Sequence, residues 1–136
     1  MKPILCLDFD GVLHSYLSGW QGPDVIPDPP VTGMVEFLIE AVKEFDVQIL
    51  SSRSRQPGGL LAMKNWLRNA INYHFDCVFA GNPKDFERAM NLFDLIGWPT
   101  EKPAAFVTID DRAITFEGQW LDIETLLNFK PWYKRI

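Results

Sequence analysis

The sequence predicts an α/β fold in which a mainly parallel sheet is covered by helices on both faces. Short apolar runs, typical of buried strands, alternate along the chain with longer segments whose apolar residues recur every three or four positions, as in amphipathic helices. In addition, three of the apolar runs end in polar residues, as strands do where they meet at a binding crevice. For a chain of 136 residues we expect one domain, residues 1–136.

The first predicted strand, residues 4–7, consists of four apolar residues in a row and leads directly into Asp8. Such a run is typical of a strand that is buried on both faces. Asp10 follows after one intervening residue, and Gly11 then allows the backbone to turn sharply. Two carboxylates this close repel each other unless a cation lies between them, and Mg²⁺ prefers such oxygen ligands. For these residues taken alone, an Asx-rich turn is the commoner explanation, so the rest of the chain has to decide.

Residues 14–30 form a predicted loop, because they are rich in glycine, proline, serine and aspartate. A loop of this length in a small domain is commonly functional. Trp20 either closes over a site or packs the loop onto the core, and we favour packing. His14, a lone histidine, is expected to be a hydrogen-bonded structural residue rather than a substrate contact. The spacing of apolar residues predicts a helix over 31–45, with Thr32 as its N-cap.

The second predicted strand, residues 47–50, runs directly into a cluster of hydroxyl and guanidinium groups. Ser51, Ser52 and Arg53 begin this cluster, and such donors, together with backbone N–H groups, suit phosphate binding. A solvated loop of serine and arginine explains the same residues equally well. With Gly11, these three residues are our candidate phosphate-binding set.

The remaining segments continue the alternation of helices and strands. We predict helices over 60–73, 85–96 and 123–129, strands over 76–80 and 104–109, and a short extended segment over 114–116. The strand over 104–109 is expected to be buried and leads into Asp110 and Asp111. Because parallel strands have their carboxyl ends at one edge of a sheet, one crevice should gather Asp8, Asp10, Ser51, Asp110 and Asp111. This convergence favours a functional site over a chance turn at Asp8.

Composition and charge limit the classes of function. The chain has 18 acidic and 13 basic residues, and its net charge of −5 argues against bulk non-specific binding of nucleic acid, although not against a local basic patch. Cys6 and Cys77 both lie in apolar runs and are expected to be buried thiols in a reducing compartment, a disulfide between them being the less favoured alternative. No apolar run approaches membrane-spanning length or forms a signal-peptide core, so we expect a cytoplasmic protein that does not act at a membrane. The sequence leaves the oligomeric state open.

Four short motifs, in order along the chain, resemble those of the haloacid dehalogenase (HAD) superfamily. Asp-Phe-Asp-Gly-Val at 8–12 is similar to the first motif, Ser51 to the second, and Ile-Asp-Asp at 109–111 to the fourth. Lys102, in a Lys-Pro-Ala-Ala context, is similar to the third-motif lysine of small capless members from bacteria and phages, whereas Lys84 lies at the distance usual in larger members. The resemblance implies a Rossmann-like three-layer sandwich without a cap domain.

The same resemblance implies a Mg²⁺-dependent phosphomonoester hydrolase. In that family scheme Asp8 is the nucleophile that forms an aspartyl-phosphate, Asp10 is the general acid and then the general base, Ser51 binds a phosphoryl oxygen, and Lys102 neutralises developing charge. The implied Mg²⁺ ligands are Asp8, the carbonyl of Asp10, and Asp110, with Asp111 either a ligand or a neighbour of one. Physical chemistry agrees, because phosphoryl transfer needs positioning and charge neutralisation above all.

An uncapped site would admit a phosphorylated small metabolite or a phosphorylated end of a nucleic acid or protein. A polynucleotide-end phosphatase is therefore one alternative, motivated by Arg53, Arg55, Lys64, Arg68 and the basic, aromatic tail over 130–136. A non-catalytic module that binds phosphate or metal is the other alternative, and the intact pair Asp8 and Asp10 argues against it.

Overall fold

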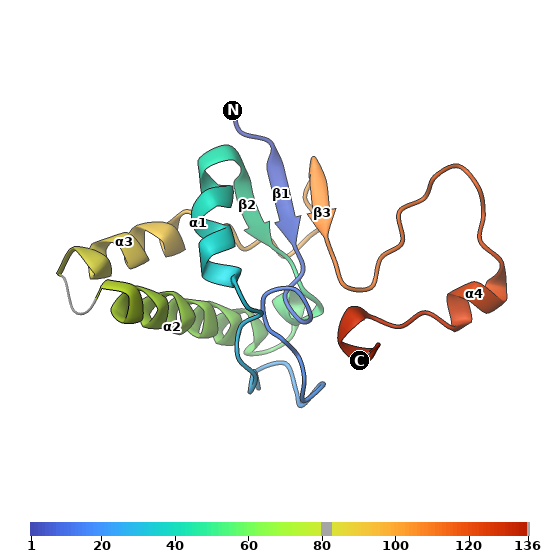
Figure 1. Ribbon diagram of the computed structural model, residues 1–136, viewed down its shortest axis with the longest axis horizontal. Helices are drawn as coiled ribbons and strands as arrows, with labels where there is room; N and C mark the ends of the chain where they lie inside the picture. The colour runs from blue at the N-terminus through green and yellow to red at the C-terminus, as the bar shows by residue number, and fades with distance from the viewer. Residues whose placement is uncertain (80–82, 136) are drawn as a thin grey trace.

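The structure, a computed structural model, describes residues 1–79 and 83–135 and is built around a small parallel sheet (Figure 1). The three strands are β1 (Ile4–Leu7), β2 (Asp46–Ile49) and β3 (Val107–Ile109). They lie in the order β2-β1-β3, so that β1 is central and pairs in parallel with both neighbours. The predicted strand over residues 4–7 is confirmed, and it is the strand that leads to Asp8.

The described helices complete a mixed α/β architecture, which confirms the predicted class. They are α1 (Met34–Glu44), α2 (Gly59–Phe79), α3 (Pro83–Asp94) and α4 (Ile123–Leu127), with two 3₁₀ segments, η1 (Ser52–Arg55) and η2 (Trp132–Lys134). Among these elements none combines the length and the apolar character that crossing a membrane requires.

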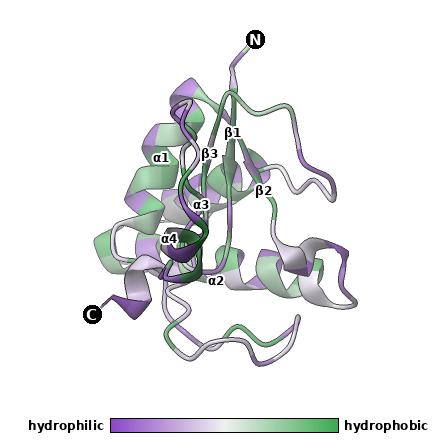
Figure 2. Ribbon diagram, turned by 90° about the vertical axis from the view of Figure 1, so that its right-hand side faces the viewer, coloured by the Kyte–Doolittle hydropathy of each residue, from purple (hydrophilic) through white to green (hydrophobic). Residues whose placement is uncertain are grey.

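One hydrophobic core joins the sheet to α1, α2 and α3. Leu5 and Leu7 point to one face of the sheet, as do their pairing partners Val47 and Ile49, and all four are almost completely buried. The helices cover this face with residues such as Leu38, Met63, Leu67, Ile71 and Phe93. In Figure 2, α1 alternates between hydrophobic and hydrophilic residues, as expected for a helix with one buried face.

The predicted strand over 76–80 is wrong for its described residues. α2 continues to Phe79, so Asp76 to Phe79 are helical, while Ala80 lies outside the described residues. The buried residues Met63, Leu67, Ile71 and Phe75 follow one another at four-residue intervals, and this helical period carries the chain through the apolar run. Cys77 is consequently exposed on the helix, whereas Cys6 is buried as predicted, and both are free thiols.

The structure also differs from the prediction at the third strand. β3 has three residues instead of the predicted six, and all three are exposed rather than buried. Residues 114–116, predicted as a short extended segment, have no regular secondary structure and add no strand to the sheet, and α4 packs against no other described helix or strand. The second helical layer of the predicted sandwich is therefore not formed by the described helices. The apolar composition of residues 104–109 predicted a strand correctly, but it did not predict which elements, if any, would cover that strand.

The first helix also starts later than the sequence predicts. α1 begins at Met34, and its N-cap is Gly33 in the left-handed region at φ 86°, not Thr32. This glycine conformation supplies the turn from the loop over 14–30 into the helix.

Candidate functional site

Three carboxylates gather where β1 and β3 end. The Asp8 N–H donates to the Ile109 carbonyl at 3.0 Å, so the two strand ends are held together. Asp8, Asp110 and Asp111 each place a carboxylate oxygen within 4.8 Å of the others. This is the crevice that parallel strand ends were expected to form.

The Asp8 carboxyl is strongly perturbed. Burial raises its pKa to about 8, and a proton on Asp8 is also favoured because it supplies a hydrogen bond to the Asp111 carboxyl. The neighbouring charges of Asp110 and Asp111 act in the same direction, against one opposing hydrogen bond of 2.8 Å from the Phe9 N–H. Without a cation, this cluster therefore holds a proton at neutral pH.

Asp111 is held in the cluster by the end of the chain. The Tyr133 hydroxyl donates to Asp111 Oδ2 at 2.9 Å and accepts from Arg112 Nη2 at 3.1 Å. The Asp111 side chain is only 2% exposed, and its other oxygen, Oδ1, is buried with no hydrogen-bond partner among the described residues. A buried, unpartnered carboxylate oxygen is costly unless a proton or a cation satisfies it.

Gly11 makes this packing possible. Its φ is +82°, and a Cβ atom at this position would overlap the Asp111 carboxylate and the Tyr133 ring. Its carbonyl also accepts a hydrogen bond of 2.7 Å from Trp132 Nε1. The structure therefore places Gly11 against Asp111 and the chain end, and it is not among the residues that line the cavity described below.

Asp10 faces cationic and polar partners instead of the other carboxylates. His14 Nδ1 donates to Asp10 Oδ1 at 2.9 Å, since its other nitrogen, Nε2, accepts from the Asp28 N–H at 3.1 Å. Arg53 Nε donates to Asp10 Oδ2 at 2.8 Å. Burial acts to raise the pKa of Asp10, but these hydrogen bonds outweigh it and the pKa lies below its ordinary value. Asp10 is therefore a carboxylate, and His14 is the buried structural residue that was expected.

Arg53 is fully buried. Its Nη1 donates to the carbonyls of Gly22 and Pro23, both at 2.9 Å, and of Val25 at 3.1 Å. The Trp20 ring lies over its guanidinium at 4.6 Å. The structure thus uses this predicted phosphate-binding residue to fasten the loop over 14–30 to Asp10. Trp20 is 46% exposed and lines the site cavity, so it contacts Arg53 without being packed into the hydrophobic core.

A cavity of about 300 Å³ opens over the carboxylates, and its lining includes Asp8, Asp10, Asp111, Ser51 and Ser52. Ser51 is the N-cap of η1, and its Oγ accepts from the Arg53 N–H at 3.1 Å. The two candidate serines are therefore brought to the same cavity as the carboxylates, at the end of β2.

Neither candidate lysine lines this cavity. Lys102 is exposed in the segment that precedes β3. It lies near Cys6 on β1, where burial and the charges of Asp8 and Asp110 raise the pKa of the thiol and the charge of Lys102 partly opposes them. Its neighbour Glu101 contacts Arg55 of η1 at 3.6 Å, so this segment passes beside the site. Lys84 lies in the first turn of α3, which Figure 1 shows at the end of α2 away from the sheet.

Three further residues line the cavity that sequence reasoning did not single out, namely Tyr16, Arg112 and Tyr133. Tyr16 has a positive φ of 61°, which is uncommon outside glycine. The aromatic character of the tail over 130–136 drew attention to its residues, but the sequence did not indicate that Tyr133 would contact Asp111 at the end of β3.

The donor set fits a hard divalent cation such as the Mg²⁺ that the motif resemblance implies. It consists of carboxylate oxygens alone, one of them buried without a partner, and it lies beside a cavity large enough for a phosphate. Comparison of the chain with known protein families, with curated proteins and with solved structures finds no match in any of the three.

Proposed function

We propose that the protein is a Mg²⁺-dependent phosphomonoester hydrolase of the HAD type that works through an aspartyl-phosphate on Asp8. One observation carries the proposal: Asp8, Asp110 and Asp111 converge at the ends of two paired parallel strands, beside a cavity that also holds Asp10 and two serine hydroxyls. The order of the four motifs along the chain supports the same assignment.

In this proposal Asp8, Asp110 and Asp111 hold Mg²⁺, and the Asp10 carbonyl completes the set that the motifs imply. When bound, the ion neutralises the carboxylates and the phosphate so that one anion can approach another. The unpartnered Oδ1 of Asp111 supports its assignment as a ligand.

The reaction proceeds in two displacements. A carboxylate oxygen of Asp8 bonds to phosphorus, and the bond from phosphorus to the leaving oxygen breaks. Because Asp10 rests as a carboxylate, the proton that the leaving oxygen takes is one that the monoanionic ester brings and that Asp10 accepts and passes on. A water molecule then attacks the phosphorus, gives a proton to Asp10, and releases orthophosphate and the Asp8 carboxylate. The Asp10 environment suits the second step directly, because its lowered pKa keeps it ready to accept a proton.

Other residues position the phosphate and the acid–base group. Ser51 and Ser52 donate hydroxyl hydrogen bonds to the phosphoryl oxygens, and Lys102 approaches from the segment beside η1. Arg53 holds the Asp10 carboxylate in place through two of its nitrogens. A cytoplasmic location belongs to the same proposal and rests on the free thiols of Cys6 and Cys77.

A second candidate, a phosphatase that acts on polynucleotide ends, is favoured by an adjoining cavity of about 320 Å³. Its lining includes the rings of Tyr16, Trp20 and Tyr133 and the cations of Arg112 and Lys134. Aromatic rings stack on bases, and cations track a phosphate backbone. Binding of an end-phosphorylated oligonucleotide that weakens steeply with salt would favour this candidate, and salt-insensitive or absent binding would remove it.

The proposal is tested by hydrolysis of a generic aryl phosphate. We expect turnover with Mg²⁺, none with EDTA, and none for D8N, whereas D94N, which makes the same change at an exposed site at the end of α3, should match the wild type. Trapping of a covalent phosphoryl group on Asp8 would exclude the non-catalytic module. Wild-type protein that binds Mg²⁺ yet hydrolyses no ester in a broad panel would leave that module as the better assignment.

A further inference from the structure

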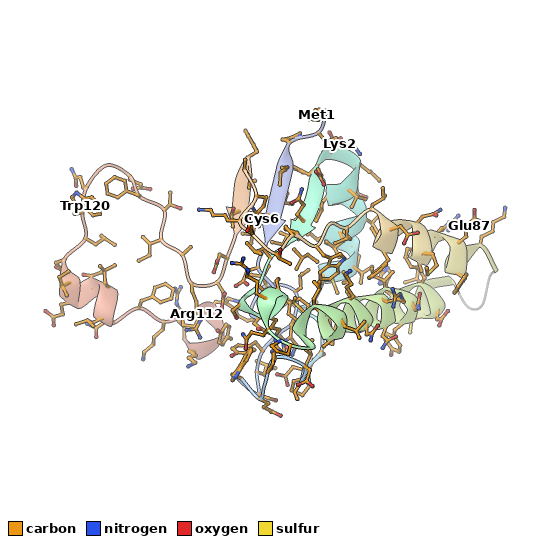
Figure 3. All side chains as sticks on the ribbon, turned by 180° about the vertical axis from the view of Figure 1, so that it is seen from behind. Met1, Lys2, Cys6, Glu87, Arg112 and Trp120 are labelled. Atoms are coloured by element: carbon orange, nitrogen blue, oxygen red, sulfur yellow. The ribbon has the colours of Figure 1, made fainter. Side chains whose placement is uncertain are left out.

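Residues 113–131 leave the site and return to it, and we refer to them as the arm. The arm starts after Arg112 and ends before Trp132, and both ends are anchored: Arg112 Nη2 donates to the Tyr133 hydroxyl at 3.1 Å, and Trp132 Nε1 donates to the Gly11 carbonyl at 2.7 Å. Between these anchors the chain swings away from the sheet, with α4 on its far side (Figure 1). Figure 3 shows Trp120 on the outer part of this excursion and Arg112 at its root.

The arm exposes most of its large apolar side chains. Trp120 is 89% exposed and Leu127 79% exposed, and the other large apolar side chains of the arm that are exposed are Ile114, Phe116, Leu121, Ile123 and Leu126. Several of them surround a hollow of about 1020 Å³ whose described lining residues all belong to the arm. Apolar side chains gathered in this way on a protein surface mark a site of interaction.

A second uncovered surface lies on the same chain, at β3. Phe106, directly before the strand, is 76% exposed, and Val107 and Ile109 are 43% and 40% exposed. β1 pairs with one edge of β3, and no described strand pairs with the other edge. An open apolar edge strand is a template for association unless something covers it.

We propose that the arm of one copy covers β3 of a second copy, and that the second copy returns the same contact. The apolar side chains of the arm are exposed, and so are those of Phe106 and β3. In addition, α4 contacts no other described helix or strand of its own chain. Reciprocal exchange across a two-fold axis satisfies both needs in both copies at once. This proposal does not depend on the proposed function.

The size of the arm is sufficient for a stable dimer. Aromatic side chains such as Phe116 and Trp120 bury about 150–250 Å² each, and five exposed aliphatic side chains accompany them. Together they provide about the 800 Å² per partner that a specific interface buries. The rings of Phe116 and Trp120 already contact each other, with centroids 4.8 Å apart, and form a preassembled apolar anchor.

The first test is the mass of the full chain in solution over a range of concentrations. We expect a dimer, and we expect W120E on the arm and F106E beside β3 each to raise the dissociation constant by at least about tenfold. L61E is the matched control, because Leu61 is 64% exposed on α2, a helix that contacts neither β3 nor α4. A wild-type monomer at every concentration, or a dimer that neither W120E nor F106E weakens, would overturn the proposal.

The second test distinguishes exchange from an arm that folds back on its own sheet. A W120E copy keeps an intact β3 surface and an F106E copy keeps an intact arm, so an equimolar mixture restores one of the two contacts. We expect the mixture to dimerise more tightly than either variant alone. Equal weakness of the mixture and the separate variants would contradict reciprocal exchange. In the wild type, amide-exchange protection over 106–109 and 114–127 should rise with concentration.

Discussion

The Arg53 guanidinium grips both oxygens of the Asp10 carboxylate, at 2.8 Å from Nε to Oδ2 and at 3.2 Å from Nη2 to Oδ1, across 43 residues of sequence. The same side chain binds three carbonyls of the loop over 14–30 through Nη1. The buried Arg53 side chain therefore holds both the Asp10 carboxylate and the loop over 14–30 that borders the candidate site.

Replacement of Arg53 by alanine should destabilise the protein by about 3–5 kcal/mol, because it leaves a carboxylate buried without its ion-pair partner. Urea unfolding of R53A measures this loss. R55A is the control, since Arg55 is 69% exposed and its contact with Glu101 at 3.6 Å is a surface ion pair worth about 1 kcal/mol or less. Equal stabilities of the two variants would show that Arg53 does not anchor the loop.

Gly11→Ala should cost about 1–3 kcal/mol or more, because the backbone at φ +82° disfavours a side chain and the new Cβ meets the Asp111 carboxylate and the Tyr133 ring. Thermal unfolding measures the loss. Gly19→Ala is the control, with a similar φ of +73° but no atom of the described residues within 4 Å of the added Cβ. If both variants lose the same free energy of unfolding, the unfavourable backbone conformation alone accounts for the loss, and the packing of Asp111 and Tyr133 against Gly11 contributes nothing.

The strand ends could be predicted from the sequence because parallel strands place their carboxyl ends at one edge. Asp8 and Asp111 are separated by most of the chain, yet the apolar run before each acidic pair was enough to bring them together. The serines after β2 were predicted for the same reason, and they line the same cavity.

Partners that depend on tertiary packing could not be predicted. A charged side chain in a polar loop is usually exposed, so nothing local indicated that Arg53 would be fully buried. Tyr133 reaches Asp111 across 22 residues, and the intervening arm has no pattern that fixes its path. For α2, a short apolar run looked the same in a strand and in a helix, and packing of Phe75 against the core decided for the helix.

Mg²⁺ binding should release protons. The pKa of Asp8 is raised to about 8, so without the ion the carboxyl is largely protonated at pH 7. The free energy of unfolding should therefore fall as the pH rises through about 8, where the buried carboxyl loses this proton. Because the ion binds the carboxylate, its affinity should increase with pH up to about 8. Titration calorimetry in two buffers of different ionisation enthalpy measures the protons released. D111N should weaken binding and D94N should not, while pH-independent affinity would show that Asp8 is not a ligand.

The ionised state of Asp10 predicts how the rate depends on the leaving group. Burial acts to raise the pKa of Asp10, but hydrogen bonds from His14 and Arg53 lower it overall, so the carboxylate lacks the proton that an alkoxide leaving group needs. That proton has to arrive with the substrate, and a phosphate monoester carries one only below its second pKa, near about 6. For an alkyl phosphate, kcat/KM should therefore fall as the pH rises above this value. An aryl phosphate, whose leaving group needs little protonation, should show a shallower fall, and D10N should reduce alkyl turnover more than aryl turnover. Parallel profiles for the two esters would mean that Asp10 is not the acid in the first step.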